Sequence, residues 1–122
     1  MNKTIVVVDD EKDIRGLIDI ILSAQRYTVI PAKSGQELFD VLARIRPDLI
    51  LLDVMMPGLD GFEVCGRLKQ SPATRDIPVV MLTVMADPRE VQKGWEAGAD
   101  AYLTKPFEPQ EFEREIRAIL GA

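Results

Sequence analysis

Five polar side chains in this sequence stand directly after apolar runs, where they have no packing role. Three are acids: Asp9 and Asp10 follow the first run, and Asp53 follows a run without a polar break. Thr83 and Lys105 follow the last two runs. Burying an unpaired carboxylate costs free energy. An acid that ends a buried segment therefore either faces solvent or belongs to a functional site. Three carboxylates, a hydroxyl and an ammonium in equivalent places favour one shared site over separate solvated ends.

The residue types in this set suit phosphoryl chemistry. Carboxylates held close together repel one another unless a cation lies among them, and Mg²⁺ is typically held by one or two carboxylates with waters. Lys105 can bind one phosphoryl oxygen and Thr83 can hydrogen-bond another. Positioning and electrostatics would then be the main catalytic work. The set predicts Mg²⁺-dependent phosphoryl transfer onto the carboxylate of Asp53 as the nucleophile.

The composition excludes several other kinds of chemistry. The 122 residues contain no histidine, which excludes histidine triads, the usual zinc sites and a phosphohistidine on this chain. A net charge of −5 argues against direct binding to nucleic acid or to an anionic membrane. The single cysteine, Cys65, excludes an internal disulfide, and its helical apolar spacing places it in the core. No secretory signal or membrane-spanning run is visible, which favours a cytoplasmic protein.

The elements that must position these side chains alternate between strands and helices in a single domain over residues 1–122. Right-handed crossovers place such strands in a parallel sheet covered on both faces, whose carboxyl edge is where ligands bind. The apolar runs predict strands over 4–8, 27–31, 49–52, 77–82 and 101–103. The helical spacing predicts helices over about 11–25, from Ser34 to before Pro47, from Asp60-Gly61 to Ser71-Pro72, from Asp87-Pro88 to Gly98, and from Pro109 to Leu120.

The chain resembles the receiver domain of bacterial two-component response regulators over essentially its whole length. The resemblance implies an α/β fold, the flavodoxin-like doubly wound (βα)5 fold with a five-stranded parallel sheet of order 2-1-3-4-5. It rests on five short motifs in the correct order and spacing: Val8-Asp9-Asp10, Leu52-Asp53-Val-Met-Met-Pro57-Gly58 with Gly61, Leu82-Thr83, Gly98-Ala99-Asp100, and Tyr102-Leu-Thr-Lys105-Pro106-Phe107.

The resemblance also implies a role for each acid. Asp53 is expected to be the phosphoacceptor. Asp10 would bind Mg²⁺ directly, and Asp9 would bind it mostly through water. The main-chain carbonyl of Met55 would be a further ligand, which needs no particular side chain.

The remaining site residues take their roles from the same resemblance. Thr83 and Lys105 would hold the phosphoryl oxygens, and the peptide bond from Lys105 to Pro106 is expected to be cis, which proline permits. Tyr102 would change position as Thr83 moves towards the phosphoryl group.

One loop departs from the common family pattern. Val84 follows Thr83 where the family usually has a small residue, and Met55 and Met85 would flank the acceptor. These bulky side chains either are neutral variation within the family or restrict the access of the phosphoryl donor and of water to Asp53.

The implied function is that of a signalling switch that is not an enzyme beyond its own phosphorylation and dephosphorylation. A sensor histidine kinase or a phosphotransfer protein would supply the phosphoryl group, which biases a two-state equilibrium. The output face, made by the predicted helix from Pro88, the strand over 101–103 and the last helix, would bind a downstream protein or a second receiver. The end of the chain just after that helix favours a single-domain receiver.

Three alternatives compete with this interpretation. A flavodoxin-like cofactor binder needs a phosphate-cradling loop after the first strand, where Asp9-Asp10-Glu11 would repel phosphate. An aspartyl phosphatase of the haloacid dehalogenase type would have a second aspartate where this chain has Met55, and would need a cap that this length hardly allows. A degenerate receiver that acts only as a scaffold would not need all five site residues.

Overall fold

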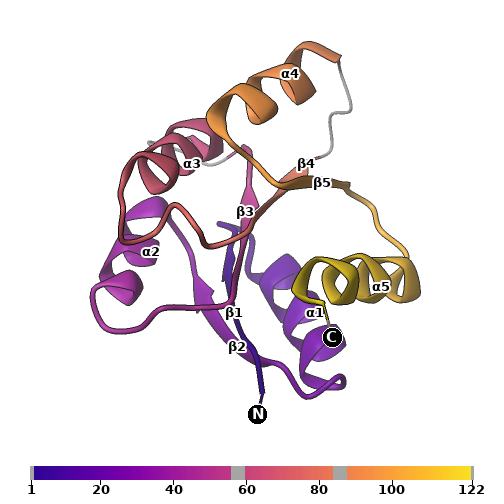
Figure 1. Ribbon diagram of the computed structural model, residues 1–122. Helices are drawn as coiled ribbons and strands as arrows, with labels where there is room; N and C mark the ends of the chain where they lie inside the picture. Colours follow the sequence, from indigo (N-terminus) through magenta and orange to yellow (C-terminus); the bar gives the residue numbers. More distant parts are fainter. Residues whose placement is uncertain (1, 56–59, 84–87, 122) are drawn as a thin grey trace.

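Five strands alternate with five helices, and all neighbouring strands pair in parallel. The computed structural model describes residues 2–55, 60–83 and 88–121. The sheet order is β2-β1-β3-β4-β5, which confirms the expected fold (Figure 1). The strands are β1 (Thr4–Val8), β2 (Thr28–Ala32), β3 (Leu49–Asp53), β4 (Val79–Thr83) and β5 (Ala101–Thr104). The helices are α1 (Lys12–Ser23), α2 (Gly35–Leu42), α3 (Gly61–Gln70), α4 (Pro88–Ala97) and α5 (Pro109–Leu120).

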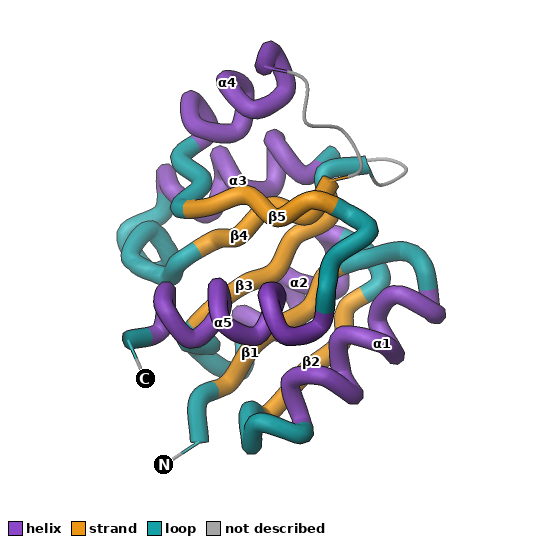
Figure 2. The backbone as a smooth tube through the Cα atoms, turned by 90° about the vertical axis from the view of Figure 1, so that its right-hand side faces the viewer, coloured by secondary structure: helices purple, strands orange, loops and turns teal. Residues whose placement is uncertain are grey.

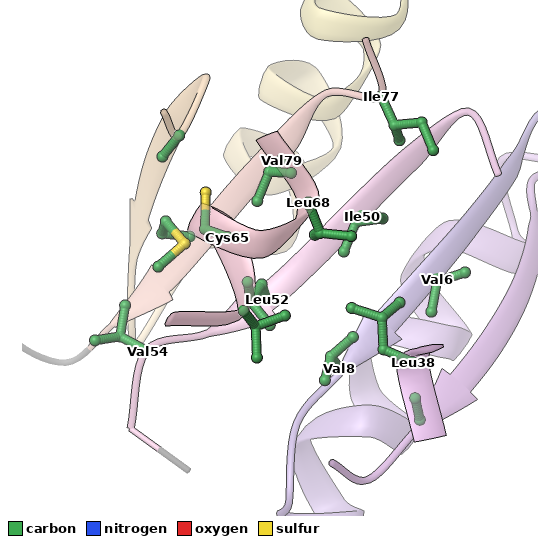
Figure 3. Packing of buried hydrophobic residues seen from close by; sticks show 14 residues of the cluster. Val6, Val8, Leu38, Ile50, Leu52, Val54, Cys65, Leu68, Ile77 and Val79 are labelled. Atoms are coloured by element: carbon green, nitrogen blue, oxygen red, sulfur yellow. The ribbon is translucent and has the colours of Figure 1, made fainter. Parts of the chain in front are cut away.

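Each face of the sheet carries its own hydrophobic core, because successive strand residues point to opposite faces. On one face, Ile5 and Val7 pack with residues of α1 and α5, and Figure 2 shows these two helices lying over the sheet. On the other face, Val6 and Val8 pack with residues of α2 and α3 (Figure 3). Cys65 is fully buried in this second core, as predicted.

Side chains cap two of the helices that face the second core. The Ser34 hydroxyl accepts a hydrogen bond from the Glu37 N–H (3.1 Å) at the start of α2. Asp60 Oδ1 accepts one from the Glu63 N–H (2.9 Å) at the start of α3. Each contact satisfies a first-turn donor that has no partner within the helix. None of the described helices is long and apolar enough to cross a membrane.

Several predicted element boundaries differ from the structure by a few residues, among them the end of α2 and the start of β4. Helix α2 ends at Leu42, so that Ile45 lies beyond it and is 38% exposed. Strand β4 begins at Val79, whereas the apolar run had placed its start at Ile77. The Ile77 N–H donates a hydrogen bond to the Thr74 carbonyl (3.0 Å) in a turn, and Pro78 has no N–H to donate to the sheet. Ile77 is buried although it precedes the strand, whereas Ile45 is apolar without being buried, so an apolar side chain alone did not mark the end of either element.

Candidate functional site

The carboxyl edge of the sheet brings together the residues that the sequence singled out. Asp9 follows β1, Asp53 ends β3 and Thr83 ends β4, and all three side chains are buried. Oxygen atoms from Asp9, Asp10 and Asp53 lie within 4.8 Å of one another. Lys105 follows β5 and reaches the same cluster. Parallel pairing produces this convergence, since it aligns the carboxyl ends of the strands at one edge.

Asp9 makes three hydrogen bonds, two at its carboxylate and one at its main-chain carbonyl. Its Oδ1 accepts a hydrogen bond from the Glu11 N–H (2.9 Å), and its Oδ2 accepts one from Lys105 Nζ (2.7 Å). The guanidinium of Arg15 donates to the Asp9 carbonyl (2.7 Å). Sequence analysis did not identify Arg15, although a cation in the second turn of a helix that follows adjacent acids was a usable signal. The buried carboxylate of Asp9 is thus paired and hydrogen-bonded at both oxygens.

Asp53 occupies an environment that disfavours its negative charge. Its Oδ1 accepts a hydrogen bond from the Met55 N–H (3.2 Å) and lies 3.6 Å from Lys105 Nζ. Burial and the charge of Asp9 raise the pKa of Asp53 to about 6, and Asp10 adds to this, while Lys105 and the Met55 N–H oppose it. A further cation beside Asp53 would stabilise its ionised form.

Lys105, which follows strand β5, contacts both Asp9 and Asp53. Its backbone N–H donates to the Thr83 carbonyl (2.8 Å), and its peptide bond to Pro106 is cis, as expected. Burial lowers the pKa of Lys105, but the hydrogen bond with Asp9 and the negative charge of Asp53 outweigh it, so the pKa lies above its ordinary value. The ammonium therefore stays charged inside the site.

The donor set of this edge fits a hard divalent cation. It consists of carboxylate oxygens, which Mg²⁺ prefers to nitrogen or sulfur. Asp10 is exposed, so one carboxylate faces solvent while Asp9 and Asp53 are buried. Burial and the charge of Asp9 raise the pKa of Asp53, and a cation beside it would offset both effects by stabilising the ionised carboxylate. The residues present therefore fit Mg²⁺.

Gly61 allows helix α3 to begin very close to the end of strand β3. Its N–H donates to the Val54 carbonyl (3.1 Å). A Cβ at this position would lie 2.5 Å from the Asp53 carbonyl oxygen and 2.8 Å from Val54 Cα. Backbone atoms cannot yield as a flexible side chain can, so only glycine fits here. The sequence contained Gly61 within a motif but offered no physical reason for it.

Tyr102 lies away from the acidic cluster, against helix α4. Its hydroxyl donates a hydrogen bond to the Glu90 carbonyl (2.9 Å). Its ring packs edge-on against that of Trp95, with the ring centroids 5.8 Å apart. A Cβ at Gly94 would lie 1.7 Å from the Tyr102 hydroxyl, so the phenol occupies the place that a larger residue of α4 would fill. Strand pairing sets Tyr102 beside Met81, two residues before Thr83.

The two loops that follow β3 and β4 lie partly outside the described residues. Met55 is described and is 59% exposed. Val84 and Met85, together with the Pro57-Gly58 part of the acceptor motif and Asp87, lie outside the described residues. The expected crowding of Asp53 therefore stays a prediction.

Comparisons with known proteins agree on one family. The family model described as response regulator receiver domain matches residues 5–117. The phosphate regulon transcriptional regulatory protein PhoB of Pseudomonas aeruginosa is 42% identical over 120 residues, covering 98% of this chain and 52% of PhoB. The alkaline phosphatase synthesis transcriptional regulatory protein PhoP of Bacillus subtilis is 45% identical, covering 98% of this chain and 49% of PhoP. The chain spans about half the length of these curated relatives.

A solved structure with the same fold supports this assignment. The receiver domain of sensor histidine kinase PA1611 from Pseudomonas aeruginosa PAO1 has a magnesium ion coordinated in its active site cleft. It is 27% identical with a TM-score of 0.90, and 100% of each chain is covered. The chain therefore belongs to the family of response regulator receiver domains, the phosphoryl-accepting switches of two-component signalling.

Proposed function

We propose that Asp53 is the residue that accepts the phosphoryl group. A carboxylate oxygen of Asp53 forms a bond to phosphorus while the bond between phosphorus and the donor's imidazole nitrogen breaks, and that nitrogen keeps the electron pair. The observation that carries this proposal is the position of Asp53, with Asp9 and Asp10 within 4.8 Å and Lys105 Nζ at 3.6 Å. Asp9 has the same neighbours, but both of its carboxylate oxygens already accept hydrogen bonds, from the Glu11 N–H and from Lys105 Nζ.

Asp10, Asp53 and the main-chain carbonyl of Met55 would hold Mg²⁺, with Asp9 acting through water. The exposed position of Asp10 supports direct contact, since its carboxylate can meet a hydrated ion at the surface. Both oxygens of Asp9 already accept hydrogen bonds, which supports the indirect role. When bound, the ion supplies positive charge that neutralises the phosphoryl oxygens.

Thr83 and Lys105 would hold the oxygens of the transferred group. Lys105 is charged and already within 3.6 Å of the acceptor, so it needs only a small movement to contact a phosphoryl oxygen. Thr83 is buried at the end of the neighbouring strand. Movement of Thr83 would change the position of Tyr102, whose hydroxyl now rests on α4.

We further propose a sensor histidine kinase or phosphotransfer protein as the donor, acting in the cytoplasm. The output face is formed by α4, β5 and α5, and it would bind a downstream protein or a second receiver. The net charge of −5 argues against direct binding of this chain to DNA. The curated relatives PhoB and PhoP are transcriptional regulatory proteins about twice as long, so the output of any full-length protein is a separate question.

Acetyl phosphate with Mg²⁺ provides the direct test. We expect intact-mass spectrometry to show one added phosphoryl group on the wild type and none on Asp53→Asn. Asp76→Asn, which changes an exposed acid far from the cluster, should be labelled like the wild type. Labelling that persists in Asp53→Asn would identify a different nucleophile, and an unlabelled wild type would favour a receiver that acts only as a scaffold.

A further inference from the structure

A second polar network lies at the amino edge of the sheet, on the side opposite the acidic cluster. Its centre is Lys69, in the last turn of α3. Lys69 Nζ donates to Asp100 Oδ2 (2.9 Å) and to the carbonyls of Ile77 (2.9 Å) and Arg75 (3.1 Å). An ammonium has three N–H donors, so the hydrogen-bonding capacity of Lys69 is fully used. None of these contacts serves the phosphoryl site directly.

Asp100 extends the network to the starts of β4 and β5. Its Oδ2 also accepts a hydrogen bond from the Val79 N–H (2.8 Å), and its own N–H donates to the Val79 carbonyl (2.8 Å). Val79 is the first residue of β4, and Asp100 immediately precedes β5. The network therefore ties together the beginnings of the two strands whose far ends carry Thr83 and Lys105.

The C-terminal end of α4 belongs to the same structure. The Gly98 N–H donates to the Trp95 carbonyl (3.0 Å), and the Ala99 N–H donates to the Gly94 carbonyl (3.0 Å). Gly98 has a φ of +98°, and a Cβ there would lie 2.8 Å from Lys69 Cγ. Glycine thus lets the chain turn tightly over the methylene stem of Lys69. We call Lys69, Val79, Gly98 and Asp100 the amino-edge corner.

The N-terminal half of α4 is held in a different way. There the carbonyl of Glu90 accepts a hydrogen bond from the hydroxyl of Tyr102 (2.9 Å), a side chain that is itself only half-buried. A neutral hydrogen bond contributes about 1 kcal/mol, and hydrogen bonds to a charged group contribute more. The corner combines charged and main-chain contacts from three elements just after α4, whereas the contact at Glu90 is made by Tyr102, the side chain that is expected to move.

We propose that the amino-edge corner is the fixed pivot of the switch, and that Lys69 and Asp100 are its positioning residues. Phosphorylation moves the N-terminal half of α4 about this corner, while the C-terminal end and the starts of β4 and β5 stay in place. Because the starts of β4 and β5 stay in place, a movement of Thr83 displaces Tyr102 and α4 instead of shifting the two strands as a whole. The inference rests on the proposed function, because it concerns the response to phosphorylation.

The single tryptophan allows this proposal to be tested. Trp95 contacts the Tyr102 ring, so its fluorescence should change when acetyl phosphate and Mg²⁺ are added. Lys69→Met keeps the stem over Gly98 but removes all three donors. We expect this variant to be fully phosphorylated by intact mass, with a Trp95 change at least ~2-fold smaller than in the wild type. Arg67→Met, on an exposed position of the same helix, is the matched control and should respond like the wild type.

Amide hydrogen exchange in the metal-free protein gives a second, independent measurement. Lys69→Met should raise exchange at the Val79, Ala99 and Asp100 amides at least ~10-fold relative to the wild type. Asp100→Asn keeps an oxygen for the Val79 N–H, so it should remain folded and show a smaller effect in the same direction. Lys69→Arg, which restores the cation, should recover part of both readouts.

Two results would overturn the pivot. One is a phosphorylated Lys69→Met protein whose Trp95 response equals that of the wild type. The other is unchanged exchange at Val79, Ala99 and Asp100 in Lys69→Met. The exchange result does not depend on phosphorylation, so it decides the pivot even in a protein that takes up no phosphoryl group, which would contradict the proposed function alone.

Discussion

Lys105 is paired more closely with Asp9 than with Asp53. Its Nζ lies 2.7 Å from Asp9 Oδ2 and 3.6 Å from Asp53 Oδ1, and its side chain is only 9% exposed. The ammonium thus serves as an internal counterion of the acidic cluster. A bound cation beside the same carboxylates would reduce the demand for this pairing and leave Lys105 available to a phosphoryl group.

Removal of Lys105 should make the protein depend more strongly on Mg²⁺. Lys105→Met leaves Asp9 buried without its partner, which typically costs 3–5 kcal/mol, so we expect a lower melting temperature without metal. Because binding to the native state stabilises it, Mg²⁺ should restore more stability to this variant than to the wild type. Thermal melts over a Mg²⁺ titration measure both effects. Lys33→Met, which breaks an exposed ion pair with Glu37, should change neither.

Asp10 should control the affinity for Mg²⁺. Asp10→Asn removes the exposed carboxylate of the cluster, so the melting temperature of this variant should respond less to millimolar Mg²⁺ than that of the wild type. Asp13→Asn, which neutralises an exposed acid in the first turn of α1, is the control and should keep the wild-type response. Melts of the wild type and Asp10→Asn that are both indifferent to Mg²⁺ would count against the site.

Asp53 should make the metal-free protein less stable as pH rises. Its pKa is about 6 in the folded protein and 3.8 ordinarily, so between about pH 4 and 6 the folded state binds more protons than the unfolded state. The free energy of unfolding therefore falls as pH rises through this window. Asp53→Asn lacks this loss and should be more stable than the wild type at pH 7 by about 2–3 kcal/mol, since one pKa unit is worth ~1.4 kcal/mol.

Urea unfolding of both proteins at pH 4.5 and pH 7 in the presence of a chelator measures this difference. The same comparison for Asp76→Asn should show no such gain. An Asp53→Asn protein with the same pH dependence as the wild type would mean that Asp53 is not the group whose charge is disfavoured.

Gly61 should be intolerant of even one added carbon. Gly61→Ala places a Cβ 2.5 Å from the Asp53 carbonyl oxygen, so either α3 or the end of β3 must shift, at a cost of about 1–3 kcal/mol. The shift should also slow phosphorylation by acetyl phosphate, because it displaces the acceptor. Gly66→Ala in the same helix has no atom within 4 Å of the new Cβ and should stabilise by up to ~1 kcal/mol. Equal stability of the two variants in urea would show that the close approach is relieved without strain.

Met55 should prolong the phosphorylated state. Its side chain is 59% exposed beside the acceptor, and it would exclude or misplace the water that attacks phosphorus. Met55→Asn could hold that water in line, and a tenfold faster decay requires only ~1.4 kcal/mol. We expect a shorter lifetime after the donor is removed in excess Mg²⁺, with Mg²⁺ affinity nearly unchanged. Met55→Leu should decay like the wild type, and equal lifetimes in all three proteins would leave Met55 without this role.

The sequence predicted that these polar groups lie together at one edge of the sheet, because strand ends can be recognised locally. β-branched apolar runs define β1 as Thr4–Val8, as the structure has it, and an acid directly after such a run must lie at the sheet edge. Four strand ends that carry three acids, a hydroxyl and an ammonium then indicated one site. The cis bond before Pro106 and the strand order followed from the family resemblance and are confirmed.

Only the tertiary structure decided which of these groups are partners. Lys105 and Asp9 are 96 residues apart, and their 2.7 Å contact depends on strand register and side-chain conformation, which local sequence does not encode. The same reason applies to Gly61, whose need for the absence of a Cβ arises from the backbone at Asp53. It applies as well to Lys69 and Asp100, which as isolated residues resemble ordinary surface charges. Spacing along the chain shows where a side chain emerges, whereas packing determines what it meets.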